Sequence, residues 1–191
     1  STVLIGQLAV VAFGVTDTVI AGRYEPQALA VLSVSSAIYI SVYVSLLGVI
    51  QALLPIFAEL FGAKKLEAIG YHFRQALYIW LALSVVGGIL LLSPYFLLQL
   101  TQVPESVQPE IKSYLGTLAL ALPAALFFRL YSSLNQSIGK PRLITWIQIG
   151  ALLIKIPLSV ILTFGLTENN GFGILGCAIA TVIVSALMCM I

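Results

Sequence analysis

The sequence predicts an all-α integral membrane protein. Of its 191 residues, 60% are hydrophobic and only 8% are charged, which leaves too little polar surface to cover a soluble domain. The mean hydropathy of +1.09 is also typical of a chain buried in lipid. Apolar stretches of about 20 residues, the length that crosses ~30 Å of hydrocarbon as a helix, recur along the chain, and most charged residues lie between them.

Six membrane spans follow from this pattern. They are predicted at residues 1–22, 29–58, 76–100, 111–134, 143–166 and 172–191. The first residue already lies within a span, is not Met and follows no basic segment, and the last residue lies within the sixth span. We therefore expect a piece of a longer protein, with six helices as a lower bound.

The basic residues between the spans predict the orientation of the chain. Five of them lie in the second and fourth connections: Lys64, Lys65, Arg74, Lys140 and Arg142. The connections on the opposite side carry only Arg23 and Lys112. Because Lys and Arg are enriched in cytoplasmic loops, the second and fourth connections and both ends of the chain should face the cytoplasm.

The first span contains one carboxylate, Asp17, in a stretch that is otherwise uncharged from its first residue. A carboxylate near the middle of a span costs about 2.5 to 3.5 kcal/mol on insertion scales, so it needs a proton, a partner or a functional role. At helical spacing it shares a small, polar stripe with Gln7, Gly14 and Ala21, which should face protein or water. The alternatives are that Asp17 caps a short span or forms an ion pair without functional consequence.

The second span carries small residues and aromatic residues. Ser41, Ser45, Gly48 and Ala52 fall on one face, where close packing between helices is expected. Three further residues of this span are interpreted as lining a substrate pathway: Tyr39, Tyr43 and Gln51. For the two tyrosine rings, packing between helices is the alternative.

Pro123 and Pro157 lie within the fourth and fifth spans, and each removes one helix hydrogen bond. In the fifth span a second polar stripe is predicted on one helix face: Gln148, Lys155, Ser159 and Thr163. The sixth span holds both cysteines, Cys177 and Cys189, about 18 Å apart along a helix and thus too distant for a mutual disulfide.

Enzymatic, nucleic-acid and metal-binding classes receive no support from the sequence. The spans contain no second carboxylate for an aspartyl dyad and no His, and the chain has no Cys/His cluster with ligand spacing and no Gly-rich phosphate loop. No basic cluster exceeds a Lys-Lys pair, so no nucleic-acid partner is expected. No cofactor or resident metal is expected either.

Five motifs in order resemble the multidrug and toxic compound extrusion (MATE) transporters, most closely their NorM-type branch. They are D-T-V-I-A-G-R at 17–23, A-L-L-P-I-F-A-E-L-F-G-A at 52–63, I-G-K-P-R at 138–142, K-I-P-L-S at 155–159 and G-C-A-I-A-T at 176–181. The resemblance implies the amino-terminal six-helix lobe of a twelve-helix, two-lobe transporter. The carboxy-terminal lobe, absent from this chain, would be its partner within the same polypeptide.

The resemblance also implies a function. It is the export of amphipathic, often cationic drugs and toxic compounds by alternating access, coupled to inward flow of H⁺ or Na⁺ across the bacterial inner membrane, with lipid around the protein. Two alternatives remain: a lipid-linked oligosaccharide flippase of the same superfamily, and a passive channel or scaffold subunit. The lack of a strongly cationic cavity lining argues against the flippase.

The resemblance maps an ion-coupling site onto four residues: Asp17, Lys155, Ser159 and Thr181. Lys155 departs from the family pattern, in which Asn is frequent at that position. An ammonium group beside Asp17 would favour the ionised carboxylate and compete with Na⁺ for it. We therefore expect either H⁺ rather than Na⁺ at this site, or a Lys155–Asp17 ion pair that breaks and reforms during transport.

Overall fold

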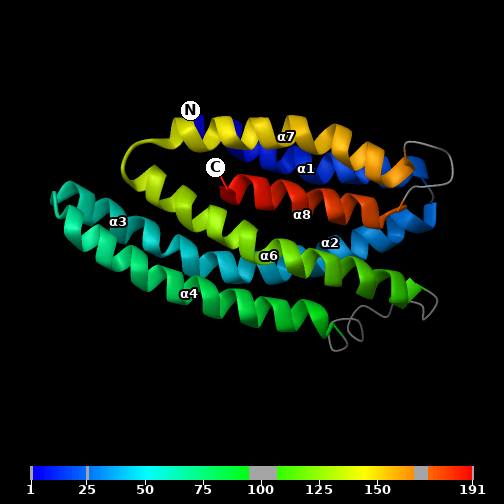
Figure 1. Cartoon of the computed structure of the whole chain (residues 1–191), viewed down its shortest axis with the longest axis horizontal. Helices are drawn as coiled ribbons and strands as arrows, with labels where there is room; N and C mark the ends of the chain where they lie inside the picture. The colour runs from blue at the N-terminus through cyan, green and yellow to red at the C-terminus, as the bar shows by residue number, and fades with distance from the viewer. Residues whose placement is uncertain (1, 25, 95–106, 166–171, 191) are drawn as a thin grey trace.

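The computed structural model of the chain describes residues 2–24, 26–94, 107–165 and 172–190. These residues form a bundle of helices without strands, which confirms the predicted all-α class (Figure 1). The helices are α1 (Thr2–Tyr24), α2 (Pro26–Gln51), α3 (Leu53–Gly62), α4 (Leu66–Leu92), α6 (Gln108–Ser137), α7 (Pro141–Phe164) and α8 (Leu175–Met190).

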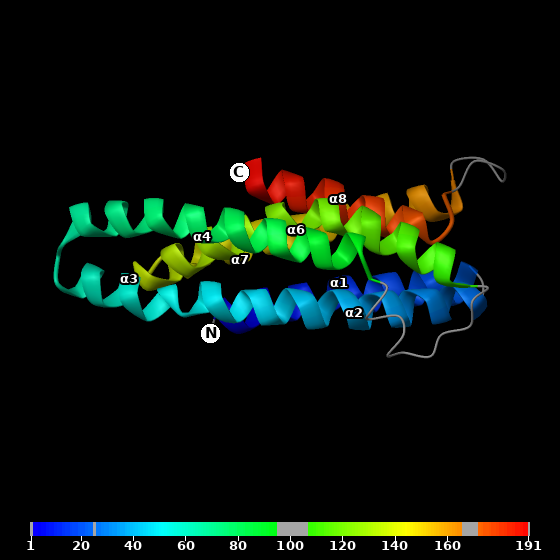
Figure 2. The ribbon, with the colours of Figure 1, turned by 90° about the horizontal axis from the view of Figure 1, so that it is seen from below.

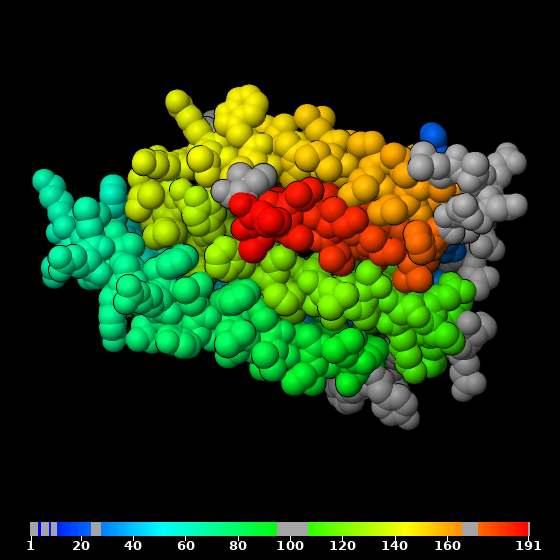
Figure 3. Space-filling view, in the orientation of Figure 1, coloured from blue at the N-terminus to red at the C-terminus, as the bar shows by residue number. Residues whose placement is uncertain are grey.

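The helices lie in two layers, and α6 belongs to one of them. Figure 2 shows α1, α2 and α3 in one layer and α4, α6 and α8 in the other. α6 contacts α8, α4, α2 and α3, and leucine is the most frequent residue on its buried face, so it forms the centre of the apolar core. α7 lies on the side of the bundle opposite α4 (Figure 1) and packs against both α1 and α8. In the space-filling view of Figure 3, α8 lies between α6 and α7.

Four stretches are long and apolar enough to cross a membrane: Ala28–Gly62, Leu66–Leu92, Gln108–Ser137 and Pro141–Phe164. α8 is a shorter apolar helix of 16 residues, and α1 spans 23 residues. The α3–α4 turn and the α6–α7 turn lie toward one end of the bundle, and the start of α1 and the end of α8 lie in the same half, nearer its middle (Figure 1).

α4 begins at Leu66, ten residues before the predicted start of the third span, and the last predicted residues of that span fall outside the described part of the chain. The expectation that Arg74 lies in a connection between helices is therefore wrong, because it belongs to α4. Charged residues end a membrane span without ending a helix, since Glu, Arg and Gln are good helix formers. Together with α3, this part of α4 extends beyond the neighbouring helix ends (Figure 1).

The second predicted span contains a break at Ala52, which separates α2 from α3. Pro55 explains the break, because it has no N–H to donate to the carbonyl of Gln51 and it fits well in the first turn of a new helix. α3 then ends in a tight turn in which Lys64 adopts a left-handed conformation (φ 57°) and the Lys65 amide donates to the Leu60 carbonyl at 3.0 Å.

The small-residue face of α2 does not pack against the other described helices. Ser41, Ser45, Gly48 and Ala52 are all exposed, and the two serine hydroxyls donate to carbonyls of their own helix. The opposite face of α2 enters the core instead, because its branched side chains bury more apolar area, as Leu46 does. In α1, Gly14 is likewise exposed, whereas Asp17 and Ala21 are buried; the side chain of Gln7 lies outside the described residues.

Two close contacts hold the helices in register. Gly87 of α4 lies against leucines of α2 and α6, and Trp80 donates its indole N–H to the carbonyl of Pro123 at 2.8 Å. Its ring also meets Phe127 edge to face, at a centroid distance of 5.5 Å. The proline inside α6 thus lies at a fixed contact with α4.

Candidate ion-coupling site

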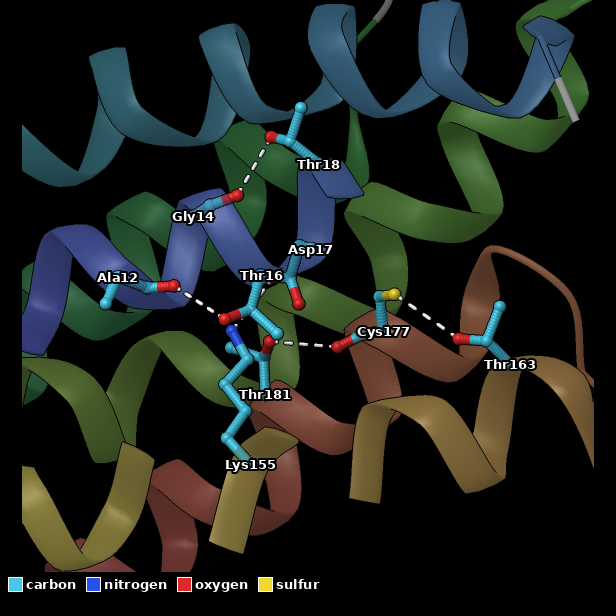
Figure 4. A network of polar contacts seen from close by, with 9 residues as sticks. All are labelled: Ala12, Gly14, Thr16, Asp17, Thr18, Lys155, Thr163, Cys177 and Thr181. Atoms are coloured by element: carbon cyan, nitrogen blue, oxygen red, sulfur yellow. Dashed lines mark hydrogen bonds and ion pairs between the residues drawn. The ribbon is translucent and has the colours of Figure 1, made fainter. Parts of the chain in front are cut away.

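A buried ion pair joins α1 to α7. Lys155 Nζ donates to Asp17 Oδ2 at 2.8 Å, and the two side chains are 3% and 12% exposed. Figure 4 shows the pair together with the neighbouring polar residues of α1, α7 and α8. The distance is that of a direct charge-assisted hydrogen bond, so each charge has its counter-charge within the protein.

The polar stripe on α7 places the ammonium inside the bundle. Gln148, Lys155, Ser159 and Thr163 are all buried, as their common face predicts, while Leu153 and Ile154 between them are exposed. α7 packs against α1 and α8, so this stripe faces both helices. The helical spacing of the polar residues in the sequence thus predicts the buried face of α7, from which Lys155 contacts Asp17.

Phe13 forms a second contact for the ammonium. Lys155 Nζ lies 4.9 Å from the centroid of the Phe13 ring, which precedes Asp17 by one helical turn. Such cation–π contacts contribute roughly 0.5 to 2 kcal/mol, the larger value when water is excluded. The lysine therefore has an anionic partner and an aromatic partner, both on α1.

Two buried oxygen atoms near the pair have no hydrogen-bond partner among the described residues. They are the second carboxylate oxygen of Asp17, Oδ1, and the hydroxyl oxygen of Ser159. Ser159 is fully buried one turn beyond Lys155 on the same face of α7. Both atoms retain the capacity to accept a hydrogen bond, which distinguishes this site from a saturated structural ion pair.

α8 contributes Thr181, whose hydroxyl donates to the carbonyl of Cys177 in its own helix at 2.9 Å. No direct hydrogen bond links it to Asp17 or Lys155. Cys177 is buried and its Sγ lies 3.3 Å from Thr163 Oγ1, so this thiol is part of the α7–α8 contact rather than an inert packing residue. The four predicted ion-coupling residues thus lie on α1, α7 and α8, and the structure joins two of them directly.

Sequence reasoning missed Tyr114. Its phenol is buried in α6 and lies within electrostatic range of Asp17, Cys177 and Tyr39. A fourth helix therefore brings a buried tyrosine close enough to interact electrostatically with Asp17. Nothing in the local pattern marks it, because a single tyrosine in an apolar helix has no recognisable periodicity.

The predicted substrate-pathway residues form two separate groups. Tyr39 and Tyr43 stack with a centroid distance of 5.8 Å and an interplanar angle of 10°, and both are half-buried against the hydrophobic core. Gln51 is exposed at the end of α2 and does not join them. In the described residues no group of three or more His, Cys, Asp or Glu side chains is arranged to hold a metal ion.

Comparison with known proteins identifies the family. A model of the MatE family matches residues 3–161. The chain is 38% identical over 183 residues to a probable multidrug resistance protein NorM of Aromatoleum aromaticum, covering 96% of this chain and 40% of that protein. It is 32% identical over 188 residues to the multidrug resistance protein NorM of Vibrio parahaemolyticus, covering 97% of this chain and 41% of that protein.

The fold is shared with a solved transporter. The Vibrio cholerae MATE transporter VcmN, in its bent form, superposes with a TM-score of 0.85 at 22% identity, covering all of this chain and 43% of that one. The chain thus spans about two fifths of the length of the proteins it matches, as expected for one lobe of a two-lobe transporter. Its sequence and its fold together confirm the resemblance noted in its motifs: the chain belongs to the MatE family.

Proposed function

We propose that the full-length protein exports amphipathic, often cationic compounds in exchange for protons, and that Asp17 is the coupling carboxylate of this lobe. The observation that carries the proposal is the buried contact between Asp17 and Lys155. The relatives named multidrug resistance proteins support the substrate class. A charged pair at this depth, with unpartnered oxygens beside it, is costly to bury, and buried charges within membrane spans are typical of functional sites.

The geometry favours H⁺ over Na⁺ at this site. The Lys155 ammonium already contacts one carboxylate oxygen at 2.8 Å, where a sodium ion would need to bind. A second cation at that distance would be repelled by the first, and burial strengthens the repulsion. The ammonium also opposes protonation of Asp17, but a proton needs only one lone pair, which the unpartnered Oδ1 offers, whereas Na⁺ needs several oxygen ligands beside the ammonium. Ser159, Thr181 and Tyr114 would then serve as neutral hydrogen-bonding partners.

Protonation supplies a physical means of moving helices. The ion pair ties α1 to α7, and neutralising Asp17 removes the attraction that holds the two helices at this point. A site that binds a proton differently in two conformations shifts the balance between them by that difference in affinity. We infer that proton binding biases α1 relative to α7, while Tyr39 and Tyr43 offer π-faces to a cationic substrate.

The proposed orientation has the amino-terminal end in the cytoplasm of a bacterial inner-membrane protein. The α3–α4 turn contains Lys64 and Lys65, and the α6–α7 turn is followed by Arg142, so basic residues cluster at one end of the bundle. The start of α1 lies in the same half of the bundle (Figure 1). Basic residues on one side of the membrane are the expected mark of its cytoplasmic face.

Efflux of a fluorescent amphipathic cation from energised cells tests this proposal. Cells expressing the full-length protein should lower their internal dye concentration below the equilibrium value, whereas Asp17→Asn should abolish this uphill export. Glu59→Gln is the matched control, because Glu59 is an exposed carboxylate on α3. Downhill dye movement that is equal in the wild type and in Asp17→Asn would instead support a passive channel and reject the proposal.

A further inference from the structure

If the ion pair opens, the Lys155 ammonium loses its anionic partner. Asp17 is the only buried acidic residue in the described part of the chain; Glu59, Glu67 and Glu110 are exposed. A buried ammonium without a partner is strongly unfavourable, so it requires neutral acceptors within reach of its side chain. Lysine has three N–H donors and a flexible four-carbon stem, which allows it to bind such acceptors.

The contact between α7 and α8 shows which residues lie level with Lys155. Gly176 lies against the backbone of Leu162 and Thr163, and Thr163 contacts Cys177. The two helices run in opposite directions from this crossing, since α7 is followed by α8 through a connection at that end. Lys155 precedes Thr163 by eight residues on α7, and both helices rise 1.5 Å per residue. Lys155 is therefore level with the turn of α8 between Thr181 and Ser185.

Two buried polar side chains lie on the side of Lys155 that faces away from this crossing. Ser185 is 5% exposed and follows Thr181 by one turn of α8. Gln148 is also 5% exposed and precedes Lys155 by about two turns on the same face of α7. Long side chains in a helix tend to lean toward its amino-terminal end, and this tendency favours Gln148 over Ser159 as a partner once the ammonium leaves Asp17.

We propose that Gln148 and Ser185 are positioning residues that receive the Lys155 ammonium when Asp17 releases it. The amide oxygen of Gln148 and the hydroxyl oxygen of Ser185 accept hydrogen bonds from a primary ammonium. Lys155 then alternates between two hydrogen-bonded positions: one on α1, at Asp17 and Phe13, and one between α7 and α8. This inference rests on the proposed function, because it names where the counter-ion of the coupling carboxylate goes.

The neighbouring groups are compatible with this movement. Among the groups that face the pair, the Tyr114 phenol of α6 and the Cys177 thiol of α8 lie within electrostatic range of Asp17, and neither carries a fixed charge. Phe13 lies beside the ammonium in the paired position. Lys155 is the only buried cation in the described residues; Arg129 of α6 is half-buried, and the other described Lys and Arg side chains are exposed.

A structure of the full-length Asp17→Asn variant tests the proposal directly, because Asn at position 17 mimics the neutral carboxyl. We expect Lys155 Nζ within hydrogen-bonding distance of Gln148 Oε1 or Ser185 Oγ. An ammonium that remains beside residue 17, or that turns to Ser159, would overturn the proposal. This outcome does not depend on whether the same variant still transports, so it separates the present inference from the proposed function.

A double-mutant cycle in proteoliposomes gives a functional test. Ser185→Ala and Gln148→Met should each lower the turnover of proton-driven export about tenfold, the effect of one hydrogen bond to a charged group, with little change in KM for the exported cation. In a Lys155→Met background the same substitutions should have no further effect. Ser84→Ala, at a buried serine of α4, is the control. Equal losses with and without Lys155 would show a purely structural role and contradict the proposal.

Discussion

Lys155 of α7 and Asp17 of α1 form a direct ion pair of 2.8 Å inside the bundle, although they are far apart in the chain. In the described helices, Asp17 and Lys155 are the only buried charged residues, and both lie at the contact between α1 and α7. The two residues are therefore expected to depend on each other for stability, for ion selectivity and for transport.

Removing one partner of the pair should destabilise the protein more than removing both. Lys155→Met leaves the Asp17 carboxylate buried without its counter-charge, and we expect a loss of about 3 to 5 kcal/mol in unfolding free energy. The double variant Asp17→Asn/Lys155→Met should recover most of this loss. Thermal unfolding of the purified full-length variants in detergent measures both effects. A double variant less stable than Lys155→Met would contradict the coupling.

Replacing the ammonium with an amide should change the ion that drives transport. Lys155→Asn removes the cation that contacts Asp17 Oδ2, so Na⁺ no longer competes with a fixed charge for the carboxylate. Proteoliposomes with this variant should respond to a Na⁺ gradient to which the wild type is indifferent. Lys112→Asn, at an exposed lysine, should leave the response unchanged. Absence of a Na⁺ response in Lys155→Asn would mean that the ammonium does not determine ion selectivity.

Ser159 should matter for transport but not for stability. Its buried hydroxyl has no hydrogen-bond partner among the described residues, so Ser159→Ala removes no bond and should change the unfolding free energy by less than about 0.5 kcal/mol. Proton-driven export should nevertheless fall several-fold, because the variant loses a hydrogen-bonding group beside the ion pair. Ser84→Ala, also buried and unpartnered, should alter neither quantity. Normal export by Ser159→Ala would exclude it from the coupling site.

Gly176 should tolerate no side chain. A Cβ there would lie 2.5 Å from the Leu162 carbonyl oxygen and 2.6 Å from the Thr163 amide nitrogen, so α7 and α8 would have to separate. We expect Gly176→Ala to destabilise the protein by about 1 to 3 kcal/mol. Gly150→Ala in α7 has open space around the new Cβ and should be neutral or slightly stabilising. Thermal unfolding of the two variants should differ accordingly; equal midpoints would contradict the close approach of the helices.

Sequence reasoning succeeded where the physics is local to one helix. The energetic cost of Asp17 in an apolar span and the helical spacing of the α7 stripe, at intervals of seven and four residues, follow from one segment each, and the structure buries Asp17 and the whole stripe. Sequence reasoning failed where the outcome depends on several helices together. The periodicity of α2 cannot tell which neighbour its small face meets, and Tyr114 reaches the site only through the packing of α6. Similarly, charge marks the limit of a span but not of α4, which continues past it.

The central claim is that Asp17 couples transport to protons while Lys155 excludes Na⁺. The most direct measurement is export of an amphipathic cation by the full-length protein in proteoliposomes, with H⁺ and Na⁺ gradients imposed separately, in the wild type and in Asp17→Asn. We predict export that follows the pH gradient alone in the wild type and is lost in Asp17→Asn. Export driven by Na⁺ without a pH gradient, or an Asp17→Asn variant that transports normally, would contradict the claim.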